Sequence, residues 1–371
     1  MRDFRKAFVA FILVVCLIVM MMTILADADD RIRTSARSAV VYQSDTATFP
    51  YAKNADEKLA MASTTKIMTG IIAIERLDPE EEITVPAEAV EIEGSSLYLS
   101  EGDVISVKDL LYGLLLQSAN DAAVVLALAV SGDIASFASL MNEKAESLSL
   151  SSTHFENPHG LDSDEHYTTA RDLALLAAYA LDNPTFREIV STYKHSFSIS
   201  GKDRVVVNHN KLLKRYDGCI GVKTGYTDKS GRCLVSAAEK DGVRLIAVTL
   251  DAPNDWADHT AMLDYCFPGY RAIDISAEIP TELKIPVIGG NVEEIGVKAD
   301  RPNETIVVMS DDDIEIKRNV KQYLVAPFNS GDEIGEAVVY RNGEPIRTYK
   351  YRTDGGSKRQ KFNIFDIFKR G

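Results

Sequence analysis

The spacing of hydrophobic and polar residues changes several times along the chain. Between residues 36 and 64, alternating runs such as Ala39-Val40-Val41-Tyr42 predict two short strands joined by a polar turn. Apolar residues then recur at helical spacing, and the first helix should begin where Ser63, Thr64 and Thr65 can cap it. Four helices are predicted: IMTGIIAIERL, VKDLLYGLLLQSANDAAVVLALAVSG as one continuous helix, ASFASLMNEKAESLSL and TARDLALLAAYALDNP.

Strand-like patterns return after Pro184, with Asp241-Gly242 as a hairpin turn. They are HSFSI, VVVNHN, CIGVKTG and GRCLVSAAEKDGVRLIAVTLD. Because early and late strands bracket a helical middle, we expect one mostly antiparallel sheet flanked by helices. This α+β domain should span residues 29–272 and close with the helix WADHTAMLDYCF. Short strands with Gly-Gly and Asn-Gly turns then predict a small all-β domain over residues 273–353.

The two ends of the chain differ in composition from the middle. Residues 1–28 have the basic start, apolar run and Ala-Asp-Ala of a secretory signal, which predicts export to the outer face of the cytoplasmic membrane. The run is also long enough to span a bilayer, so an uncleaved anchor stays open. Residues 354–371 combine five basic residues with apolar ones that share one side of a helix, which favours a membrane-associating tail. A frayed tail is the alternative.

Charge and cysteine content exclude several classes of function. Acidic residues outnumber basic ones 55 to 41, for a net charge of -14, so a nucleic acid partner is not expected. The four cysteines lack CxxC spacing, which argues against a zinc site and a disulfide-dense scaffold. At most one bridge is plausible, between Cys219 and Cys233. We predict no cofactor and no metal.

Candidate chemistry begins at Ser63-Thr64-Thr65-Lys66. A serine hydroxyl needs an adjacent base to act as a nucleophile near neutral pH. Residues three apart lie on one side of a helix, so Lys66 could take the proton of Ser63. Taken alone, the pattern is equally typical of a helix cap.

Two further motifs lie far along the chain. Ser118-Ala119-Asn120 follows an apolar segment, and Lys223-Thr224-Gly225 ends a strand, where Gly221 and Gly225 would leave room for a ligand. Alone, the first could be a helix interruption and the second an edge strand protected by a lysine.

Together, Ser-x-x-Lys, Ser-x-Asn and Lys-Thr-Gly resemble the motif set of penicillin-recognising serine enzymes. The segments FENPHGLDSDEHYTTARDLALLA and DGCIGVKTGYTDKSGRCLVSAA are similar to low-molecular-mass penicillin-binding proteins that act as D-alanyl-D-alanine carboxypeptidases. The likeness covers nearly the whole chain. It implies a β-lactamase/transpeptidase-like catalytic domain, a second β-rich domain and a C-terminal amphipathic membrane anchor.

The resemblance assigns roles residue by residue. Ser63 would form an acyl-enzyme with the penultimate D-alanine, and Lys66 would be its general base. Ser118 would relay a proton to the departing D-alanine, and Asn120 would hold the peptide amide. The expected reaction removes the terminal D-alanine from peptidoglycan stem pentapeptides.

Substrate recognition is assigned in the same way. Lys223 and Thr224 would bind the terminal carboxylate, and the substrate would pair as a strand beside Gly225. The backbone N–H groups of Ser63 and Tyr226 would form the oxyanion hole.

Two supporting residues and one departure complete the site. Asp172 would support it from behind, with a plain helix N-terminal acid as the alternative, and His209 stands where relatives often carry arginine. The middle motif is Ser-Ala-Asn rather than Ser-Asp-Asn, and there is no convincing E-x-x-L-N loop to supply a deacylating glutamate. We therefore expect β-lactams to be slow-turnover covalent inhibitors.

Two other functions stay open. In a transpeptidase or endopeptidase, an amine would replace water as acceptor or a cross-link would be the substrate. A β-lactam sensor or cell-wall-binding protein would keep the serine without turnover, although the intact set of motif residues argues against this.

Overall fold

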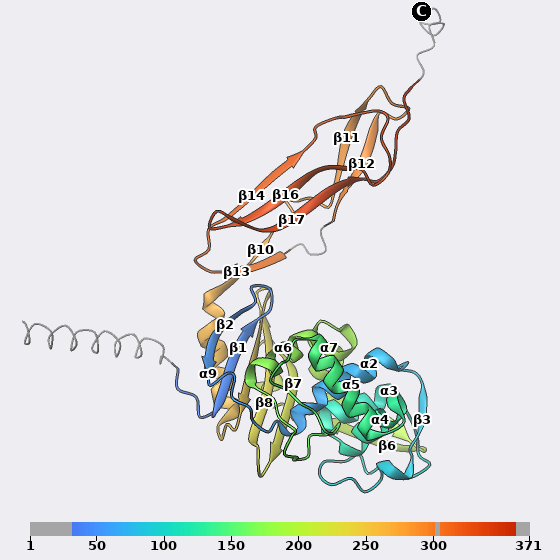
Figure 1. Ribbon diagram of the computed structural model, residues 1–371, viewed down its shortest axis with the longest axis vertical. Coiled ribbons are helices and arrows are strands. Elements are labelled where there is room, and N and C mark those ends of the chain that lie inside the picture. Colours follow the sequence, from blue (N-terminus) through green and yellow to red (C-terminus); the bar gives the residue numbers. More distant parts are fainter. Residues whose placement is uncertain (1–31, 301–304, 361–371) are drawn as a thin grey trace, which may run out of the picture. The chain divides into compact units, whose positions relative to one another are not determined.

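The computed structural model describes residues 32–300 and 305–360, which form two compact units (Figure 1). The first holds the residues up to Ser44, Thr48–Glu239 and Arg244–Cys266. The second holds Asp45–Ala47, Lys240–Val243 and the residues from Phe267 onward. The contacts thus change over between Cys266 and Phe267 rather than at residue 272, because β10 (Tyr270–Asp274) pairs with β13 (Thr305–Met309) of the second unit.

The predicted leader, residues 1–28, and residues 361–371 of the predicted tail lie outside the described residues. Within the described ranges, no single helix is both long and apolar enough to cross a membrane. Helices α4 and α5 together satisfy the same test of length and composition, but only as a pair bent by 84°.

The first unit is built on an antiparallel sheet flanked by helices, as predicted (Figure 1). The residues after the apolar β8 make the predicted turn, where Asp241 and Gly242 have φ of 49° and 79°, as a tight hairpin requires. The strand order is β2 (Thr48–Lys53), β1 (Ser38–Gln43), β9 (Val243–Leu250), β8 (Gly231–Lys240) and β7 (Cys219–Thr227).

Both faces of this sheet are covered, which explains why β1 is buried at every position. Alternate residues of β1 and β9, such as Val40 and Val248, join the main hydrophobic core with the helices of one face. On the other face lies α9 (Asp255–Cys266), whose buried His259 bonds the hydroxyls of Ser236 and Thr249. The sheet is therefore a rigid support for the strand that carries Lys223.

Only some of the helices begin with a side-chain cap. The side chains of Asp133 and Thr169 accept backbone N–H bonds at the starts of α5 and α6. At the start of α2 the hydroxyls of Thr64 and Thr65 instead donate to the carbonyls of Met61 and Ala62, so the predicted cap is wrong. The helices are α2 (Lys66–Arg76), α3 (Val107–Tyr112), α4 (Asn120–Ser131), α5 (Ile134–Ser147), α6 (Ala170–Leu181), α7 (Pro184–Ser191) and α8 (Leu212–Arg215).

The predicted continuous helix over 107–132 is broken, and this break matters for the site. After α3 the chain forms a π-helical turn, Gly113–Gln117, and Ser118 has a left-handed φ of 65° before α4 begins at Asn120. Helical periodicity was correct on both sides, but a polar Ser-Ala-Asn in an apolar run marks a chain break. The break turns Ser118 toward the cleft described below.

Shorter elements surround this core. Strands β3 (Glu82–Thr84) and β4 (Val104–Ser106) form one hairpin-like pair, and β5 (Lys194–Ile199) and β6 (Lys202–Val207) form another. These two pairs stand apart from the main sheet. Short 3-10 turns lie at Ala62–Thr65, Ala87–Ala89 and Phe267–Gly269.

The second unit is all-β, as its short alternating runs predicted. Its core includes Val297, Ala337 and Tyr351, and the predicted Asn342-Gly343 turn joins two long strands. In the larger sheet the strand order is β14 (Ile314–Val320), β16 (Glu333–Arg341), β17 (Glu344–Thr353), β12 (Glu294–Ala299), β11 (Glu282–Ile288) and β15 (Leu324–Val325).

The bridge considered between Cys219 and Cys233 does not form, and both thiols are free. In the ladder between β7 and β8, Cys219 stands opposite Ala238 while Cys233 stands opposite Gly225, so the two cysteines are several rows apart. Burial raises the pKa of each thiol to about 11, which leaves both protonated at neutral pH.

Candidate active site

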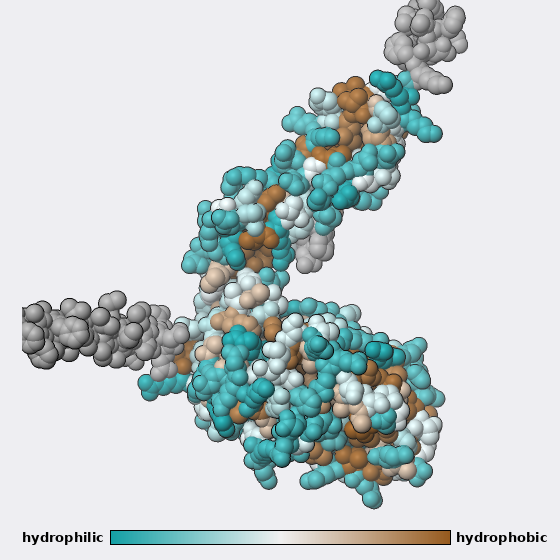
Figure 2. Space-filling view, in the orientation of Figure 1, coloured by the Kyte–Doolittle hydropathy of each residue, from teal (hydrophilic) through white to brown (hydrophobic). Residues whose placement is uncertain are grey.

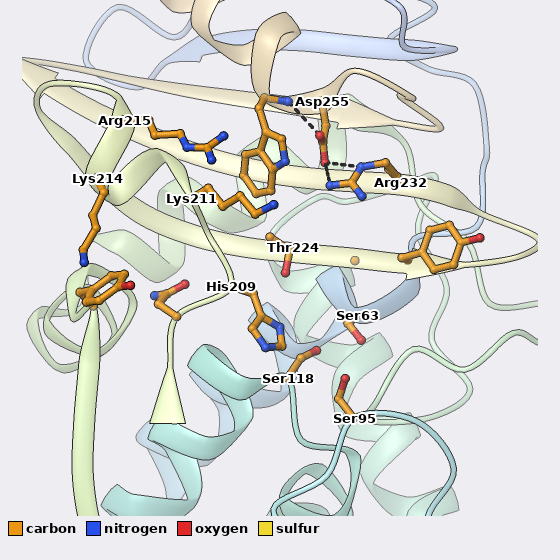
Figure 3. A pocket seen from close by; sticks show the side chains of 15 residues that line it. Ser63, Ser95, Ser118, His209, Lys211, Lys214, Arg215, Thr224, Arg232 and Asp255 are labelled. Carbon is orange, nitrogen blue, oxygen red and sulfur yellow. Dashed lines mark hydrogen bonds and ion pairs between the residues drawn. The ribbon is translucent and has the colours of Figure 1, made fainter. Parts of the chain in front are cut away.

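The three motifs meet at one cleft of about 680 Å³ in the first unit (Figure 3). Ser63 comes from the turn before α2, Ser118 from the break before α4, and Thr224, Gly225 and Tyr226 from β7. Figure 3 shows Ser63 and Ser118 facing each other below the strand that bears Thr224. The sequence reasoning thus placed distant residues at one site.

The amine of Lys66 lies directly behind Ser63. Its Nζ is 2.9 Å from Ser63 Oγ, 2.6 Å from Asn120 Oδ1 and 2.6 Å from the carbonyl oxygen of His159. Lys66 has no exposed surface. The base expected from the Ser-x-x-Lys spacing is therefore in contact with the expected nucleophile.

The surroundings of Lys66 disfavour its charged form. Burial lowers the pKa of Lys66 well below its ordinary value, and the nearby Lys223 lowers this pKa further. The buried carboxylate of Asp121 acts in the opposite direction. A buried amine with a lowered pKa, in contact with a hydroxyl, has the properties of a general base.

Two glycines allow other segments to pack closely against the turn that carries Ser63. Ala62 has a left-handed φ of 46°, and a Cβ on Gly160 would come within 2.0 Å of its carbonyl oxygen. A Cβ on Gly225 would lie 3.1 Å from Ser63 N. The absence of a side chain at Gly225 therefore lets β7 approach the backbone at Ser63. Gly225 also lines the cleft, and its expected role in leaving room for a ligand stays a prediction.

A buried histidine supports the same turn. His166 Nε2 lies 2.7 Å from Thr65 Oγ1, and its Nδ1 accepts the N–H of Glu156. Burial lowers the pKa of His166 to about 4, so the ring is neutral at neutral pH. Since Nδ1 accepts, Nε2 carries the proton and donates to Thr65, whose own hydroxyl donates to the carbonyl of Ala62.

Asn120 belongs to the Ser-x-Asn motif and also bonds three other parts of the site. Its Oδ1 accepts from Lys66, its Nδ2 donates to the carbonyl of Glu93, and its backbone N–H donates to the carbonyl of Ser95. Both ends of its amide thus have protein partners. Its predicted contact with the peptide amide stays a prediction.

The next residue, Asp121, holds the loop that lies along the cleft. Its buried carboxylate accepts bonds from the Ser96 hydroxyl and from the backbone N–H groups of Leu97 and Leu99. The sequence reasoning did not single out Asp121. A carboxylate beside the Ser-x-Asn motif, ahead of an apolar helix, was the available signal.

Lys223 lies behind the cleft rather than on its surface. It is 1% exposed, its Nζ donates to the carbonyl of Thr224 at 2.8 Å, and burial lowers its pKa to about 7. Thr224 lines the cleft, as does Tyr226, whose side chain is 62% exposed and donates its hydroxyl to Asp228. Lys223 can thus act on a bound carboxylate mainly through its field.

The two supporting residues differ in position. His209 lines the cleft, and burial together with Lys223 lowers its pKa. Asp172 lies in the first turn of α6, where its carboxylate accepts from the N–H of Ser152 and the hydroxyl of Thr153. Asp172 is not among the residues that line the cleft, so any support it gives is indirect.

Several residues of the cleft were not anticipated. Ser95 and Asn208 contribute polar groups, Tyr193 and Trp256 contribute rings, and a group of cations adds positive charge. The cations are Lys211, Lys214, Arg215 and Arg232. They come from unremarkable sequence around α8 and β8, and only the fold brings them to the cleft.

Within the described residues, no group of three or more His, Cys, Asp or Glu side chains is placed to hold a metal ion.

Comparisons with known proteins agree with this geometry. Residues 24–254 match the family model "D-alanyl-D-alanine carboxypeptidase", and residues 278–357 match "Penicillin-binding protein 5, C-terminal domain". The chain is 34% identical over 322 residues to D-alanyl-D-alanine carboxypeptidase DacF of Bacillus subtilis, covering 84% of this chain and 83% of that protein. It is 32% identical to DacC of Escherichia coli, covering 79% and 77%.

Solved structures give the same result. Penicillin-binding protein 5 of Haemophilus influenzae aligns with a TM-score of 0.66 and 25% identity, over 88% of this chain and 98% of that one. The Streptomyces K15 DD-transpeptidase aligns with a TM-score of 0.61 and 33% identity, over 64% and 98%. The predicted family, fold and enzyme class are confirmed. The chain belongs to the D-alanyl-D-alanine carboxypeptidase family of serine hydrolases, whose members act on peptides ending in D-Ala-D-Ala and are inhibited by β-lactams.

Proposed function

We propose that this enzyme releases the terminal D-alanine from peptidoglycan stem pentapeptides through an acyl-enzyme on Ser63. The observation that carries the assignment is the 2.9 Å contact between Ser63 Oγ and the fully buried amine of Lys66. An amine with an ordinary pKa would be charged near neutral pH and could not take a proton.

The hydrogen bonds around Lys66 support its role as the base. A neutral amine has two N–H donors and one lone pair. Asn120 Oδ1 and the His159 carbonyl can only accept, so they take the two donors. The lone pair then faces the Ser63 hydroxyl, which is the arrangement needed to remove its proton during attack.

The developing oxyanion would be bound by the backbone N–H groups of Ser63 and Tyr226. Support comes from the close packing of β7 on this turn, where a Cβ on Gly225 would lie only 3.1 Å from Ser63 N. Donors fixed by a sheet and a turn do not reorganise during the reaction, which is the basis of oxyanion stabilisation.

Recognition of the chain end would favour a carboxypeptidase over an endopeptidase. The terminal carboxylate would lie at Thr224 in the positive field of Lys223, and Ser118 would pass a proton to the departing D-alanine. A substrate without a free carboxylate would leave these groups unpaired. Tyr226 would pair with the peptide in an extended conformation.

An amine acceptor is the second candidate outcome of the same acyl-enzyme. A specific comparison favours considering it, since the similar Streptomyces K15 structure is named a DD-transpeptidase. Adding a D-amino acid to the assay separates the two. Both enzymes release D-alanine when the acyl-enzyme forms. A water-accepting enzyme then converts the donor mainly to the shortened peptide, whereas a transpeptidase converts it to the peptide that ends in the added D-amino acid.

The experiment that tests the site is acylation by a fluorescent penicillin followed by peptide mapping. We expect the label on Ser63 and slow release, because no deacylating glutamate is expected near it. Labelling of another residue, or labelling that persists in Ser63→Ala, would overturn the assignment.

We also propose that the enzyme works at the outer face of the cytoplasmic membrane, held there by residues 354–371. The composition of this tail, basic and apolar on one helical side, is the support. Deleting residues 361–371 should move leader-processed protein from the membrane fraction to the soluble one, with D-alanine release unchanged. Retention of the shortened protein in membranes would favour an N-terminal anchor instead.

A further inference from the structure

The cleft is cationic although the chain as a whole is acidic. Acids outnumber bases 55 to 41 in the sequence, whereas the lining residues include four lysines and arginines and one carboxylate, Asp255. Charges of one sign inside a cleft focus the field and raise the local concentration of an oppositely charged ligand. The excess of positive charge in the cleft therefore favours a ligand with negative charge.

Two of these cations share one aromatic ring. The Nζ of Lys211 lies 6.0 Å from the ring centroid of Trp256, and the guanidinium of Arg232 lies 5.8 Å from it. Trp256 is the only tryptophan of the chain. A ring face attracts a cation and limits its motion, so the indole restrains both cations. Figure 3 shows Lys211 and Arg232 among the residues that line the cleft.

Asp255 fixes the direction of Arg232. Its Oδ2 lies 3.0 Å from Arg232 Nε and 2.9 Å from Nη2, while its Oδ1 accepts the backbone N–H of Trp256. Asp255 is 3% exposed, so it cannot turn to solvent. One carboxylate cannot neutralise both Arg232 and Lys211, so the pair keeps a net positive charge that a bound anion would balance.

The register of the sheet places Arg232 beside the strand residues that line the cleft, and Lys211 lines the same cleft. Arg232 of β8 stands opposite Tyr226 of β7, and it is the diagonal neighbour of Thr224. Opposed residues in an antiparallel pair point to the same face, and diagonal neighbours are within reach of long side chains. Lys223, by contrast, lies behind the strand and has its Nζ on the Thr224 carbonyl.

We propose that Lys211 and Arg232, held by Trp256 and Asp255, form a subsite that binds a carboxylate of the donor peptide. The inference rests on the proposed function and adds residues to its substrate recognition. The carboxylate is either the free chain end or an acidic side chain further from the scissile bond. Both have the same chemistry, and the fork of an arginine suits either.

The test compares two matched pairs of peptides. In the first pair, an acylated peptide ends in D-Ala-D-Ala or in its carboxamide. In the second, the terminus is free, and one residue before the D-alanines is glutamate or glutamine. The preference for carboxylate over amide is the ratio of the two kcat/KM values within a pair. General damage to the protein lowers both members of a pair together, so it leaves this ratio unchanged.

Two variants and one control make the test specific. Lys211→Gln removes an exposed charge, and Arg232→Gln with Asp255→Asn removes an ion pair without leaving a buried carboxylate alone. Lys229→Gln is the control, because Lys229 pairs with Asp164 at 3.1 Å on the turn after β7 and does not line the cleft. Each test variant should lower one of the two preferences about tenfold, as expected for a charge-assisted hydrogen bond.

A fall in the first preference identifies the chain end as the ligand, and a fall in the second identifies the acidic side chain. Unchanged ratios for both pairs in both test variants, or an equal fall in Lys229→Gln, would overturn the inference. D-alanine release by the parent enzyme from the free peptides measures the proposed function separately, whatever the ratios show.

Discussion

Two groups of cations meet at this cleft, and they differ in burial. Lys66 and Lys223 are almost completely buried and have backbone or amide oxygens as hydrogen-bond partners. Lys211 and Arg232 lie at the surface of the cleft against Trp256. Basic side chains are therefore present at this cleft in two environments, one buried and one at the surface.

Burial changes what a lysine can do. Desolvation lowers the pKa of Lys66 well below its ordinary value and brings that of Lys223 to about 7, so burial favours the neutral form of both amines. The cations at the surface of the cleft are placed to attract and orient an anion. We therefore assign proton transfer to Lys66, and carboxylate binding to the field of Lys223 and to the surface pair Lys211 and Arg232.

The largest expected difference between the two groups is in rate. Lys66→Met should lower D-alanine release and penicillin acylation by about 10³-fold, because it removes the base while keeping the volume of the buried chain. Lys211→Gln should affect peptide selection only, and acylation by a neutral ester substrate should be unchanged. Stopped-flow kinetics measure the acylation rates of the two variants. If Lys66→Met kept a tenth of the parent rate, Lys66 would not be the base, and the proposed difference between the buried and exposed cations would be contradicted.

A smaller effect is expected from the backbone that positions Ser63. Gly160→Ala would place a Cβ within 2.0 Å of the Ala62 carbonyl and should lower acylation about 100-fold. Gly132→Ala is the matched control, because Gly132 has a similar φ, 82° against 88°, but nothing within 4 Å of its added Cβ. Melting temperatures should fall in both variants, and acylation only in the first. Equal acylation rates would show that the turn tolerates displacement.

The smallest expected effect is in the pH dependence of kcat/KM, which tests both buried lysines in one experiment. Lys66 must be neutral, so kcat/KM should rise as pH increases through its lowered pKa. Lys223 must be charged, so kcat/KM should fall as pH increases above about 7. Lys223→Arg, which stays charged, should remove the alkaline fall, and the terminal carboxamide peptide should show less of it. An alkaline fall that persists in Lys223→Arg belongs to another group.

The sequence was sufficient for the reacting groups and for the order of the elements. Ser-x-x-Lys, Ser-x-Asn and Lys-Thr-Gly are local patterns with a chemical reason, and the sheet and helices follow from periodicity. The break at Ser118 was left open as a possible helix interruption, because apolar residues on both sides also fit a single helix. The left-handed φ of 65° at Ser118 is what the periodicity did not show.

The sequence also did not show the structural roles of several individual residues. Gly225 was expected to make space for a ligand, and the sequence did not show that a Cβ there would also lie 3.1 Å from Ser63 N. Trp256, Lys211 and Arg232 come from three separate elements, and no local pattern connects them. Nor could spacing show that Cys219 and Cys233 are out of register in the ladder of β7 and β8.

The central claim is that Ser63, activated by a buried Lys66, releases D-alanine from a free peptide end. The most direct measurement is the release of D-alanine from an acylated lysyl-D-Ala-D-Ala peptide by the parent ectodomain and by Ser63→Ala. The account predicts steady release by the parent and none above background by the variant. Equal release by both proteins, or no release by the parent, would contradict it.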